Sequence, residues 1–535
     1  MGLVSPASPG SIPITGGAAI LIAAASGLAA VAWIDRTAAL FPYLMQPGLA
    51  AAVALAAGVG FLDDMRPLRP WQKLAGQLLA AGVAVRMGLT FDLLDVPGVD
   101  GALTVVWLVW ASNAFNVTDM MDGLAAGVGV IGAVGMACIG SATGDAGLMI
   151  LGLVTSGSLA GFFVHNAPRA RIYMGDAGSL PIGMLLGGMA VLAVDGDAGW
   201  MNVATAPLLL GVVMFEALFL CVIRTARGVP VTQASRDHTA DRLRLMGLST
   251  RETLVLLLLV QGTCVALALY GKSVDEAAAW AAVAVIAAAL AGGALLATVD
   301  VRLDAAGVRA RGRAWFSRSW LVHLLIWRDL KRTAPHARGR MLDLGCGRQP
   351  YRSLFEPQVD GIVAVDRDRL RYARDEAGAD AWCDAQALPF GDGAFDTVLS
   401  NQMLEHVRRP QKVMDEAARV LRPGGKLILT APHIWGVHEV PHDYFRFTPF
   451  GLRHLAEEAG LVVEEVSAMA GFWVTAGARF SYYAERFGRG VLSLPVRLTH
   501  LPLQALALGL DRIHRVESEA WNHLLVARKP GEVNG

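Results

Sequence analysis

Two adjacent aspartates, Asp63 and Asp64, end an apolar run in the stretch GFLDDMRPLRPWQKLAGQ (residues 60–77). Neighbouring carboxylates repel each other and are costly to bury, so their position beside an apolar segment indicates a function. Three more polar stretches interrupt apolar sequence: SNAFNVTDMMDG (112–123), HNAPRARIYMGDAGS (165–179) and SRDHTADRLRLMG (235–247). They add Asp119, Asp122, Asp176 and His238 to the residues that could do chemistry.

Carboxylates of this kind suit Mg²⁺, which is usually held by one or two carboxylates together with the phosphates of a substrate. Lys73 and the arginines nearby suit a phosphorylated or nucleotide substrate, because cations and phosphate oxygens form strong hydrogen bonds. A helix cap at a membrane interface explains one such aspartate. It does not easily explain Asp63, Asp64, Asp119, Asp122 and Asp176 together.

The elements that carry these residues are expected to be membrane helices. Hydrophobic residues make up 54% of the 535 residues and charged residues 17%, against ~25% charged in average soluble domains. Residues 1–300 contain about ten apolar segments that approach the length of a transmembrane helix. They lie near 17–34, 46–62, 74–90, 101–113, 124–141, 145–164, 178–194, 203–222, 252–270 and 277–298.

The charge of the loops predicts their orientation. Alternate loops concentrate arginine and lysine, so these loops and both termini are expected in the cytoplasm. All four polar stretches belong to that set, and the topology therefore brings them to one membrane face. The net charge of +0 and the absence of a basic stripe with interleaved aromatics argue against nucleic-acid binding. Five cysteines without paired spacing indicate no disulfide framework or zinc site.

The stretches GFLDDMRPLRPWQKLAGQ, NAFNVTDMMDGLAAG and YMGDAGSLPIG resemble, in order, the motifs of polyprenyl-phosphate N-acetylhexosamine-1-phosphate transferases. This family includes the undecaprenyl-phosphate GlcNAc-1-phosphate transferases and the phospho-MurNAc-pentapeptide translocases. The resemblance implies transfer of a sugar phosphate from a UDP-sugar to polyprenyl phosphate, with Mg²⁺ and release of UMP. Asp176 and Asp122 are then the expected metal ligands, and Asp63, Asp64 and Asp119 complete the catalytic set. Substrate contacts are expected from Lys73, Asn113, Asn116, Arg236 and His238.

Three features depart from that family. Relatives often carry an H-x-H-H loop where this chain reads His238-Thr-Ala-Asp241, which leaves the sugar open. Met120 stands where a glycine is usual. The start, GLVSPASPGSIPITGG, resembles the loop after the family's first helix, so either that helix is lost or the start codon is placed late.

Residues 301–337 are expected to form a basic juxtamembrane linker, with binding of anionic lipid as the alternative. After it, MLDLGCGRQPY (341–351) predicts a strand, a tight turn and a helix start. Gly345 and Gly347 allow the backbone to approach a ligand closely, and Asp366 ends a second apolar run about 20 residues later, where an acid can bind ribose hydroxyls.

Together with DAQALPFGDGAFDTVLSNQMLEHV and VLRPGGKLILTAP, this series resembles the class I S-adenosylmethionine-dependent methyltransferases over residues 338–535, an α/β Rossmann-like fold. The resemblance implies that the cofactor contacts Asp343, Gly345, Gly347, Asp366, Asp384, Ala385 and Asn401. Glu405 and His406 follow the fourth strand, at the sheet edge where ligands bind.

The methyl acceptor is harder to predict. HEVPHDYFRFTPFG (438–451) follows the fifth strand, so a general base for a hydroxyl, or mere surface packing, is expected among His406, His442, Asp443 and Tyr444. No metal motif is evident in this half. Residues 472–513 are either an insertion lying on the membrane or an extra packed helix, and 524–530 are expected to form the last strand.

The sequence therefore predicts a polytopic all-α membrane domain (1–300) fused to a methyltransferase (338–535) in the bacterial inner membrane, with its C-terminal domain in the cytoplasm. Its expected partners are a UDP-sugar, polyprenyl phosphate and membrane lipids, with a homodimer as a possibility. The methyltransferase is expected to act on the lipid-linked sugar or a later glycan intermediate. In the alternative, the membrane half is an inactive anchor or lipid-binding module.

Overall fold

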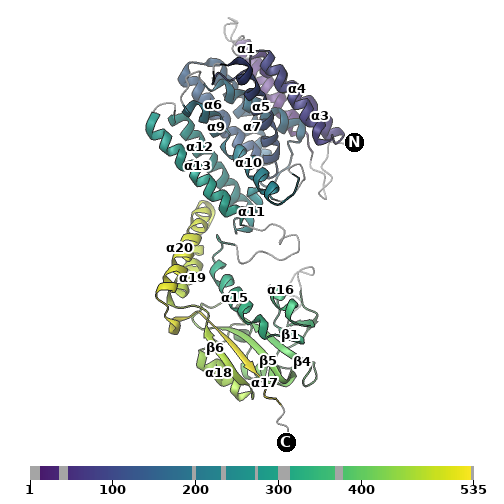
Figure 1. Cartoon of the computed structure of the whole chain (residues 1–535), viewed down its shortest axis with the longest axis vertical. Helices are drawn as coiled ribbons and strands as arrows, with labels where there is room; N and C mark the ends of the chain where they lie inside the picture. The colour runs from purple at the N-terminus through teal and green to yellow at the C-terminus, as the bar shows by residue number, and fades with distance from the viewer. Residues whose placement is uncertain are drawn as a thin grey trace. The chain divides into compact units, whose positions relative to one another are not determined.

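The computed structural model describes residues 13–34, 46–94, 96–194, 200–230, 237–271, 275–298, 314–367 and 378–531. The chain divides into two compact units, one made of Met1–Arg244 and Leu248–Val301 and the other of Leu245–Gly247 and Arg302–Gly535 (Figure 1).

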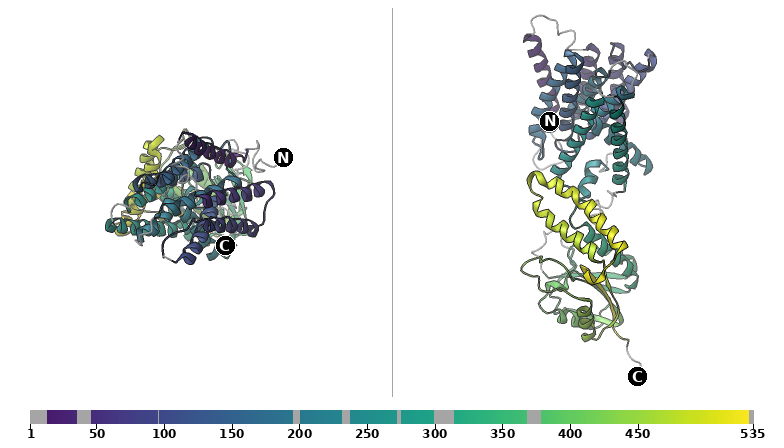
Figure 2. Two further views of the ribbon diagram at one scale, coloured as in Figure 1. Left: turned by 90° about the horizontal axis from the view of Figure 1, so that it is seen from above. Right: turned by 90° about the vertical axis from the view of Figure 1, so that its left-hand side faces the viewer.

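The first unit is a bundle of helices that lie side by side (Figure 2). The helices are α1 (Gly16–Ile34), α3 (Pro47–Met65), α4 (Pro70–Arg86), α5 (Pro97–Thr118), α6 (Leu124–Thr143), α7 (Ala146–Asn166), α8 (Asp176–Leu192), α9 (Trp200–Leu209), α10 (Gly211–Ala226), α11 (Thr239–Leu245), α12 (Thr250–Gly271) and α13 (Asp275–Ala297). The polar stretch 112–123 is not wholly a loop as predicted, because α5 continues to Thr118 and carries Asn113 and Asn116.

Among the described residues, six helices are long and apolar enough to cross a membrane, or seven if one bent pair counts as a span. The sixth, Gly490–Ile513, belongs to the second unit, so the expected count of about ten is not confirmed. The predicted span 203–222 is not straight: its two parts, Val203–Leu209 and Gly211–Ala226, meet at an angle of 88°.

The side chain of Gln261 on α12 stabilises the backbone at this bend. Its Oε1 accepts a hydrogen bond from the amide of Val212 (3.0 Å), and its Nε2 donates to the carbonyl oxygen of Leu209 (2.8 Å). A break in a membrane helix frees backbone groups that lipid cannot satisfy, and this buried glutamine satisfies one on each side of the bend.

Glycines set the distance between α3 and α8. A Cβ at Gly60 would collide with the carbonyl oxygen of Asp176, the first residue of α8, whereas a Cβ at Gly58 would meet no atom within 4 Å. Close approach of two helix backbones is the usual role of small residues in membrane bundles. It holds the end of α3, with Asp63 and Asp64, against the start of α8.

The second unit is built on a seven-stranded sheet with the order β3-β2-β1-β4-β5-β7-β6. Its strands are β1 (Arg340–Leu344), β2 (Gly361–Asp366), β3 (Ala381–Trp382), β4 (Phe395–Asn401), β5 (Leu421–Pro432), β6 (Val462–Ala468) and β7 (Asn522–Arg528). The first five strands in that order are parallel, and β7 runs antiparallel to β5 and β6. The predicted strands at 341–344, before Asp366 and near 524–530 are confirmed, although the last one ends at Arg528.

Helices cover both faces of this sheet over two separate apolar cores (Figure 1). They are α15 (Trp320–Thr333), α16 (Arg352–Phe355), α17 (Pro410–Val420), α18 (Pro449–Glu458), α19 (Phe472–Ala484) and α20 (Ser493–Ile513). Short 3₁₀ turns add η2 (Ala334–His336), η3 (Glu356–Gln358), η5 (Leu404–His406), η6 (Glu485–Phe487), η7 (Gly490–Leu492) and η8 (Glu517–Glu519).

For residues 472–513 the structure supports the packed-helix alternative. The carboxylate of Asp511 on α20 accepts hydrogen bonds from the amide of Gly471 at the start of α19 (3.1 and 3.0 Å). The buried Gln504 accepts one from the amide of Leu321 on α15 (2.9 Å). Although α20 is apolar enough to count as a candidate span, its buried polar side chains therefore bind it to the second unit.

A pair of histidines joins β5 to β7. His523 is 3% exposed, and its Nε2 lies 3.1 Å from the Nδ1 of His433, which directly follows β5. Burial, reinforced by the neighbouring imidazole, lowers the pKa of His523 from its usual 6.5 to about 4. The folded protein thus holds this imidazole neutral at pH values where an unfolded chain would protonate it.

Gly60→Ala should destabilise the first unit by about 1–3 kcal/mol, because the added methyl group forces α3 away from α8. Gly58→Ala on the same helix is the matched control, and it should be neutral or stabilising by up to about 1 kcal/mol through helix propensity. Thermal unfolding of both variants in detergent micelles tests this expectation. Equal melting temperatures for the two variants would contradict the close α3–α8 contact.

Lowering the pH from about 7.5 to about 5 should cost the β5–β7 region about 2 kcal/mol, because the unfolded state then binds a proton that folded His523 does not. His523→Asn should remove this dependence, whereas His454→Asn, at an exposed position on α18, should keep it. Hydrogen exchange of β7 peptides in the full-length chain, corrected for the intrinsic effect of pH, measures the difference. A wild type whose β7 protection does not change with pH would show the expectation to be wrong.

Candidate active sites

The first candidate site gathers around the ammonium group of Lys73 on α4. Its Nζ donates to Asp63 Oδ2 on α3 (3.0 Å) and to Asp176 Oδ2 on α8 (2.8 Å). The other oxygen of Asp63 accepts from the amide of Leu68 (2.7 Å). Asp63 and Asp176, more than 100 positions apart in the sequence, thus both pair with Lys73. Each of the three side chains is partly exposed.

The Asp64 carboxylate has a different role in the geometry. Its two oxygens accept hydrogen bonds from the backbone amides of Asp176 and Ala177 (2.9 Å each), at the first turn of α8. Carboxylates are favoured at a helix N-terminus, where amides lack partners and the helix dipole is positive. Gly175 precedes them with φ +66°, and a Cβ there would lie 2.7 Å from Asp64 Oδ2, so this position requires glycine.

Asn116 belongs to the same cluster and Asn113 does not. The Nδ2 of Asn116 donates to Asp176 Oδ1 (2.9 Å) and to Ser179 Oγ (2.7 Å). The Nδ2 of Asn113 donates instead to Gln77 Oε1 (2.7 Å), about one turn earlier on α5. The structure therefore places Asn113 in a side-chain pair with α4, away from the acids.

Asp119 and Asp122 lie on the connection between α5 and α6. Asp122 Oδ2 accepts from the amide of Ala170 (2.9 Å), while Asp119 is repelled by the carboxylates of Asp176, Asp122 and Asp64. Three carboxylates, those of Asp63, Asp64 and Asp176, thus meet at Lys73 and the start of α8, and Asp119 and Asp122 carry further negative charge nearby. This excess of negative charge fits a hard divalent cation such as Mg²⁺. The donor set leaves open which acids would bind the ion.

His238 is partly buried and anchored rather than lying free in a surface loop. Its Nδ1 lies 2.9 Å from Oε1 of Glu216 on α10, and the hydroxyl of Thr239 donates to the other oxygen of the same carboxylate. Arg236 lies outside the described residues.

Sequence reasoning missed Gln77, Ser179 and Glu216. A signal existed for Glu216, because an acid within the apolar segment 203–222 is costly unless it has a partner. The sequence shows Gln77 as a polar residue inside a predicted span, but it does not show that Asn113 is its partner.

The second unit contains a cavity of about 990 Å³ at the carboxyl ends of β1, β2 and β4. All seven predicted cofactor residues line it: Asp343, Gly345, Gly347, Asp366, Asp384, Ala385 and Asn401. Ligands of open α/β sheets bind at this edge, because the strands end there in loops with free backbone groups.

Hydrogen bonds shape the first loop of this cavity. The amide of Gly347 donates to Asp366 Oδ2 (2.8 Å), which ties the loop after β1 to the end of β2. Gly345 has φ +74°, and a Cβ there would collide with the side chain of Met403. Burial, helped by the nearby Asp366, raises the pKa of Asp343 to about 7.

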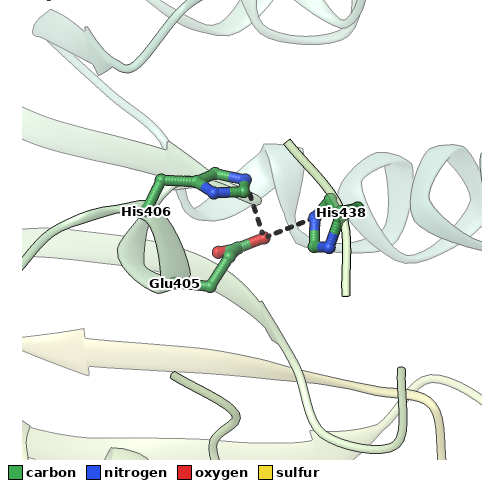
Figure 3. Close-up of side chains that lie close together, drawn as sticks. All are labelled: Glu405, His406 and His438. Atoms are coloured by element: carbon green, nitrogen blue, oxygen red, sulfur yellow. Dashed lines mark ion pairs between the residues drawn. The ribbon is translucent and has the colours of Figure 1, made fainter. Parts of the chain in front are cut away.

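The four acceptor candidates separate into two groups. His406 and His442 line the cavity, whereas Asp443 and Tyr444 are absent from its lining. Asp443 accepts from Arg446 (2.7 and 2.8 Å) and from the amide of His438 (2.9 Å), and these bonds lower its pKa to about 2. An ionised, hydrogen-bonded Asp443 is a poor general base, so the geometry favours the two histidines. His438, which sequence reasoning did not single out, lies beside Glu405 and His406 (Figure 3).

Comparison with known proteins identifies both units. The family model described as glycosyl transferase family 4 matches residues 46–194, and a methyltransferase domain model matches residues 342–429. The first match covers Lys73 and all five clustered acids. The second runs from within β1 to within β5 and covers all seven predicted cofactor residues.

Three of the relatives that match the chain illustrate the similarity. A protein of Streptomyces coelicolor described as a glycosyltransferase is 34% identical over 46% of this chain and 58% of its own length. The decaprenyl-phosphate N-acetylglucosaminephosphotransferase of Mycolicibacterium smegmatis is 32% identical over 47% of this chain and 69% of its own length. The phospho-N-acetylmuramoyl-pentapeptide-transferase of a Synechococcus strain is 40% identical over 30% and 50%.

This chain thus spans between half and about two thirds of the length of these relatives. Its apolar helices and these matches make it a membrane protein with two transferase domains. The chain belongs to glycosyl transferase family 4, with polyprenyl-phosphate N-acetylglucosamine-1-phosphate transferases among its relatives, and it carries a fused methyltransferase domain.

Proposed function

We propose that the first unit transfers a sugar 1-phosphate from a UDP-sugar to polyprenyl phosphate, releasing UMP, in the synthesis of a cell-envelope glycan. The observation that carries this proposal is the cluster of three carboxylates, Asp63, Asp64 and Asp176, around Lys73 and the start of α8. Such a concentration of acids is costly unless a cation and phosphates complete it. The activities for which these relatives are named support the same chemistry.

In this reaction the lipid phosphate is the nucleophile, and it needs positioning more than activation because it is already anionic. Lys73, held between Asp63 and Asp176, would orient a phosphate and stabilise negative charge that develops on the sugar-linked phosphorus. When bound, Mg²⁺ would supply further stabilisation of that charge, with Asp176 and Asp122 as the proposed ligands. Asn116 would hold the Asp176 carboxylate in place.

His238 is proposed to contact the nucleotide or a phosphate. The Glu216 carboxylate fixes its ring through Nδ1, so the opposite nitrogen is the one available to a substrate. Arg236 remains a proposed substrate contact. The reaction would take place at the cytoplasmic face of the bacterial inner membrane, and the second unit would lie in the cytoplasm with its cofactor.

We propose that the second unit is an S-adenosylmethionine-dependent methyltransferase. The cavity at the carboxyl edge of the sheet supports this, with Asp343, Gly345 and Gly347 at the methionine end and Asp366 at the ribose. Asp384 and Ala385 would lie beside the adenine, and Asn401 would complete the wall. The proposed acceptor is the lipid-linked sugar made by the first unit or a later intermediate of the same glycan, since a tether raises the effective concentration.

The alternative is an inactive membrane half that serves as an anchor. The altered histidine loop favours it, whereas the retained acids oppose it.

Asp176→Asn should lower UMP release by about 100-fold or more in a detergent assay with polyprenyl phosphate, Mg²⁺ and a panel of UDP-sugars. The substitution removes a charge that Lys73 and a metal ion would need, while Asn keeps the size of the side chain. Removal of divalent cations with EDTA should abolish the activity, and Mg²⁺ should restore it.

Asp145→Asn is the matched control for that experiment. Asp145 caps α7 by accepting from the amide of Leu148 (2.9 Å), at the opposite end of α6 from Asp122, and Asn caps helices equally well. It should therefore keep wild-type activity. A wild type that releases no UMP from any UDP-sugar would support the anchor alternative, and an active Asp176→Asn would remove the proposed role of Asp176.

Gly345→Ala should weaken binding of S-adenosylhomocysteine by about 10-fold or more, because the methyl group strains the loop and displaces Met403 into the cavity. Gly361→Ala, at the start of β2, meets no atom within 4 Å and should bind as wild type. Isothermal titration calorimetry measures both. Transfer of labelled methyl groups to purified lipid-linked product then tests the acceptor, and an active cofactor site that labels no such product would exclude it.

A further inference from the structure

Three side chains lie close together (Figure 3): Glu405 and His406 from η5, which follows β4, and His438 from the segment after β5. Of these, His406 lines the cofactor cavity. The Nε2 of His406 lies 3.7 Å from Glu405 Oε1, and the Nε2 of His438 lies 4.0 Å from the same oxygen. One ligand atom from each residue falls within 4.8 Å of the others. These separations are too long for hydrogen bonds.

The partners of the other ring nitrogens indicate what faces the carboxylate. His406 Nδ1 lies 2.6 Å from the carbonyl oxygen of His442, which can only accept, so Nδ1 carries the hydrogen. In a neutral imidazole the lone pair is then on Nε2, which lies 3.7 Å from Glu405 Oε1 and 3.5 Å from Oε2 of Glu439. The Nδ1 of His438 has partners of both kinds. The carbonyl oxygen of Gly436 (3.3 Å) and Asp443 Oδ2 (3.4 Å) can accept from it, whereas Nη2 of Arg446 (3.3 Å) can only donate to it.

The environment of Glu405 independently indicates a cation. Its side chain is fully buried, and neither carboxylate oxygen has a hydrogen-bond partner. A buried carboxylate without a donor costs several kcal/mol or more, unless a cation or a proton compensates it. Its Oε1 points toward the Nε2 atoms of His406 and His438, and the neutral ring of His406 presents a lone pair there. A buried carboxylate without a hydrogen-bond partner, with two imidazole nitrogens close by, is an arrangement that suits a cation.

We propose that Glu405, His406 and His438 bind a divalent transition-metal ion, Zn²⁺ by donor type, with an open coordination position toward the cofactor cavity. Two imidazoles and one carboxylate favour Zn²⁺ over Mg²⁺, which prefers oxygen ligands throughout. Three protein ligands with an open fourth position are the pattern of a catalytic zinc site. Asp443, held by Arg446, would orient His438 from outside, as carboxylates commonly do for ligating histidines.

The open position faces the cavity, because His406 lines it together with Glu439 and His442. This part rests on the proposed methyltransferase function: the ion would bind a hydroxyl oxygen of the acceptor, so the site is specific for O-methylation. The bound hydroxyl loses its proton to solvent water more readily. The oxygen lone pair then forms a bond to the methyl carbon while the methyl–sulfur bond breaks, and its electron pair neutralises the sulfonium as S-adenosylhomocysteine leaves.

The test measures metal directly in the full-length protein. After treatment with EDTA and incubation with Zn²⁺, the desalted wild type should retain about one Zn²⁺ per chain more than Glu405→Gln or His438→Gln, as a three-ligand site requires. Affinity for Zn²⁺ should fall by about 100-fold or more in both variants, and by about 10–100-fold in Asp443→Asn. Co²⁺ in place of Zn²⁺ should give visible absorption bands in the wild type that both ligand variants lose.

Two controls separate this site from others. His454→Gln removes an exposed histidine of α18, and Asp176→Asn alters the membrane cluster; both should retain the additional Zn²⁺. Binding of S-adenosylhomocysteine by Glu405→Gln and His438→Gln confirms that each variant is folded. Because His438 is partly exposed and outside the sheet, its variant keeps the test valid if the Glu405 variant unfolds.

Equal Zn²⁺ in the wild type and in a folded ligand variant would overturn the proposal, as would a wild type that retains none. Metal bound as expected, together with no methyl transfer to any hydroxyl acceptor, would leave the metal site established and refute its role in O-methylation. A wild type that does not bind S-adenosylhomocysteine would instead refute the methyltransferase function itself.

Discussion

The hydrogen bonds from the first two amides of α8 to the Asp64 carboxylate are the contact on which the membrane site depends. They fix the end of α3 to the start of α8, and Gly60 and Gly175 allow the two backbones to come close enough. Asp63 and Asp176 then lie on either side of Lys73. The Asp64 carboxylate is costly to place at a membrane edge, but its hydrogen bonds bring Asp63 and Asp176 together.

Other polar side chains that the apolar segments carry also have specific partners. Gln261 satisfies the backbone at the bend between α9 and α10, and Glu216 holds His238. Lipid offers no hydrogen bonds, so such partners must come from within the protein. Polar residues in these helices consequently mark either a structural repair, as at Gln261, or a candidate site.

The second unit solves a different problem, because a parallel sheet leaves its loop-bearing edge open to a ligand. Asp366 ties the loop after β1 to the end of β2, and the cavity forms where these ends meet β4. Glu405 remains buried beside it without a hydrogen-bond donor, while Asp443 nearby has several. Two acids of one region thus differ in role because Arg446 reaches only one of them with a hydrogen bond.

The sequence by itself determined the two-domain character, the acids at the ends of apolar segments, and the strands and glycines that line the cofactor cavity. Each of these is a local pattern of hydrophobic periodicity or turn residues, which short stretches of chain specify. Tertiary structure alone decided which partners meet. Asp64 and the amide of Asp176 are 112 residues apart, so only folding could pair them. Folding likewise produced the bend in the span 203–222 and brought His438 close to Glu405.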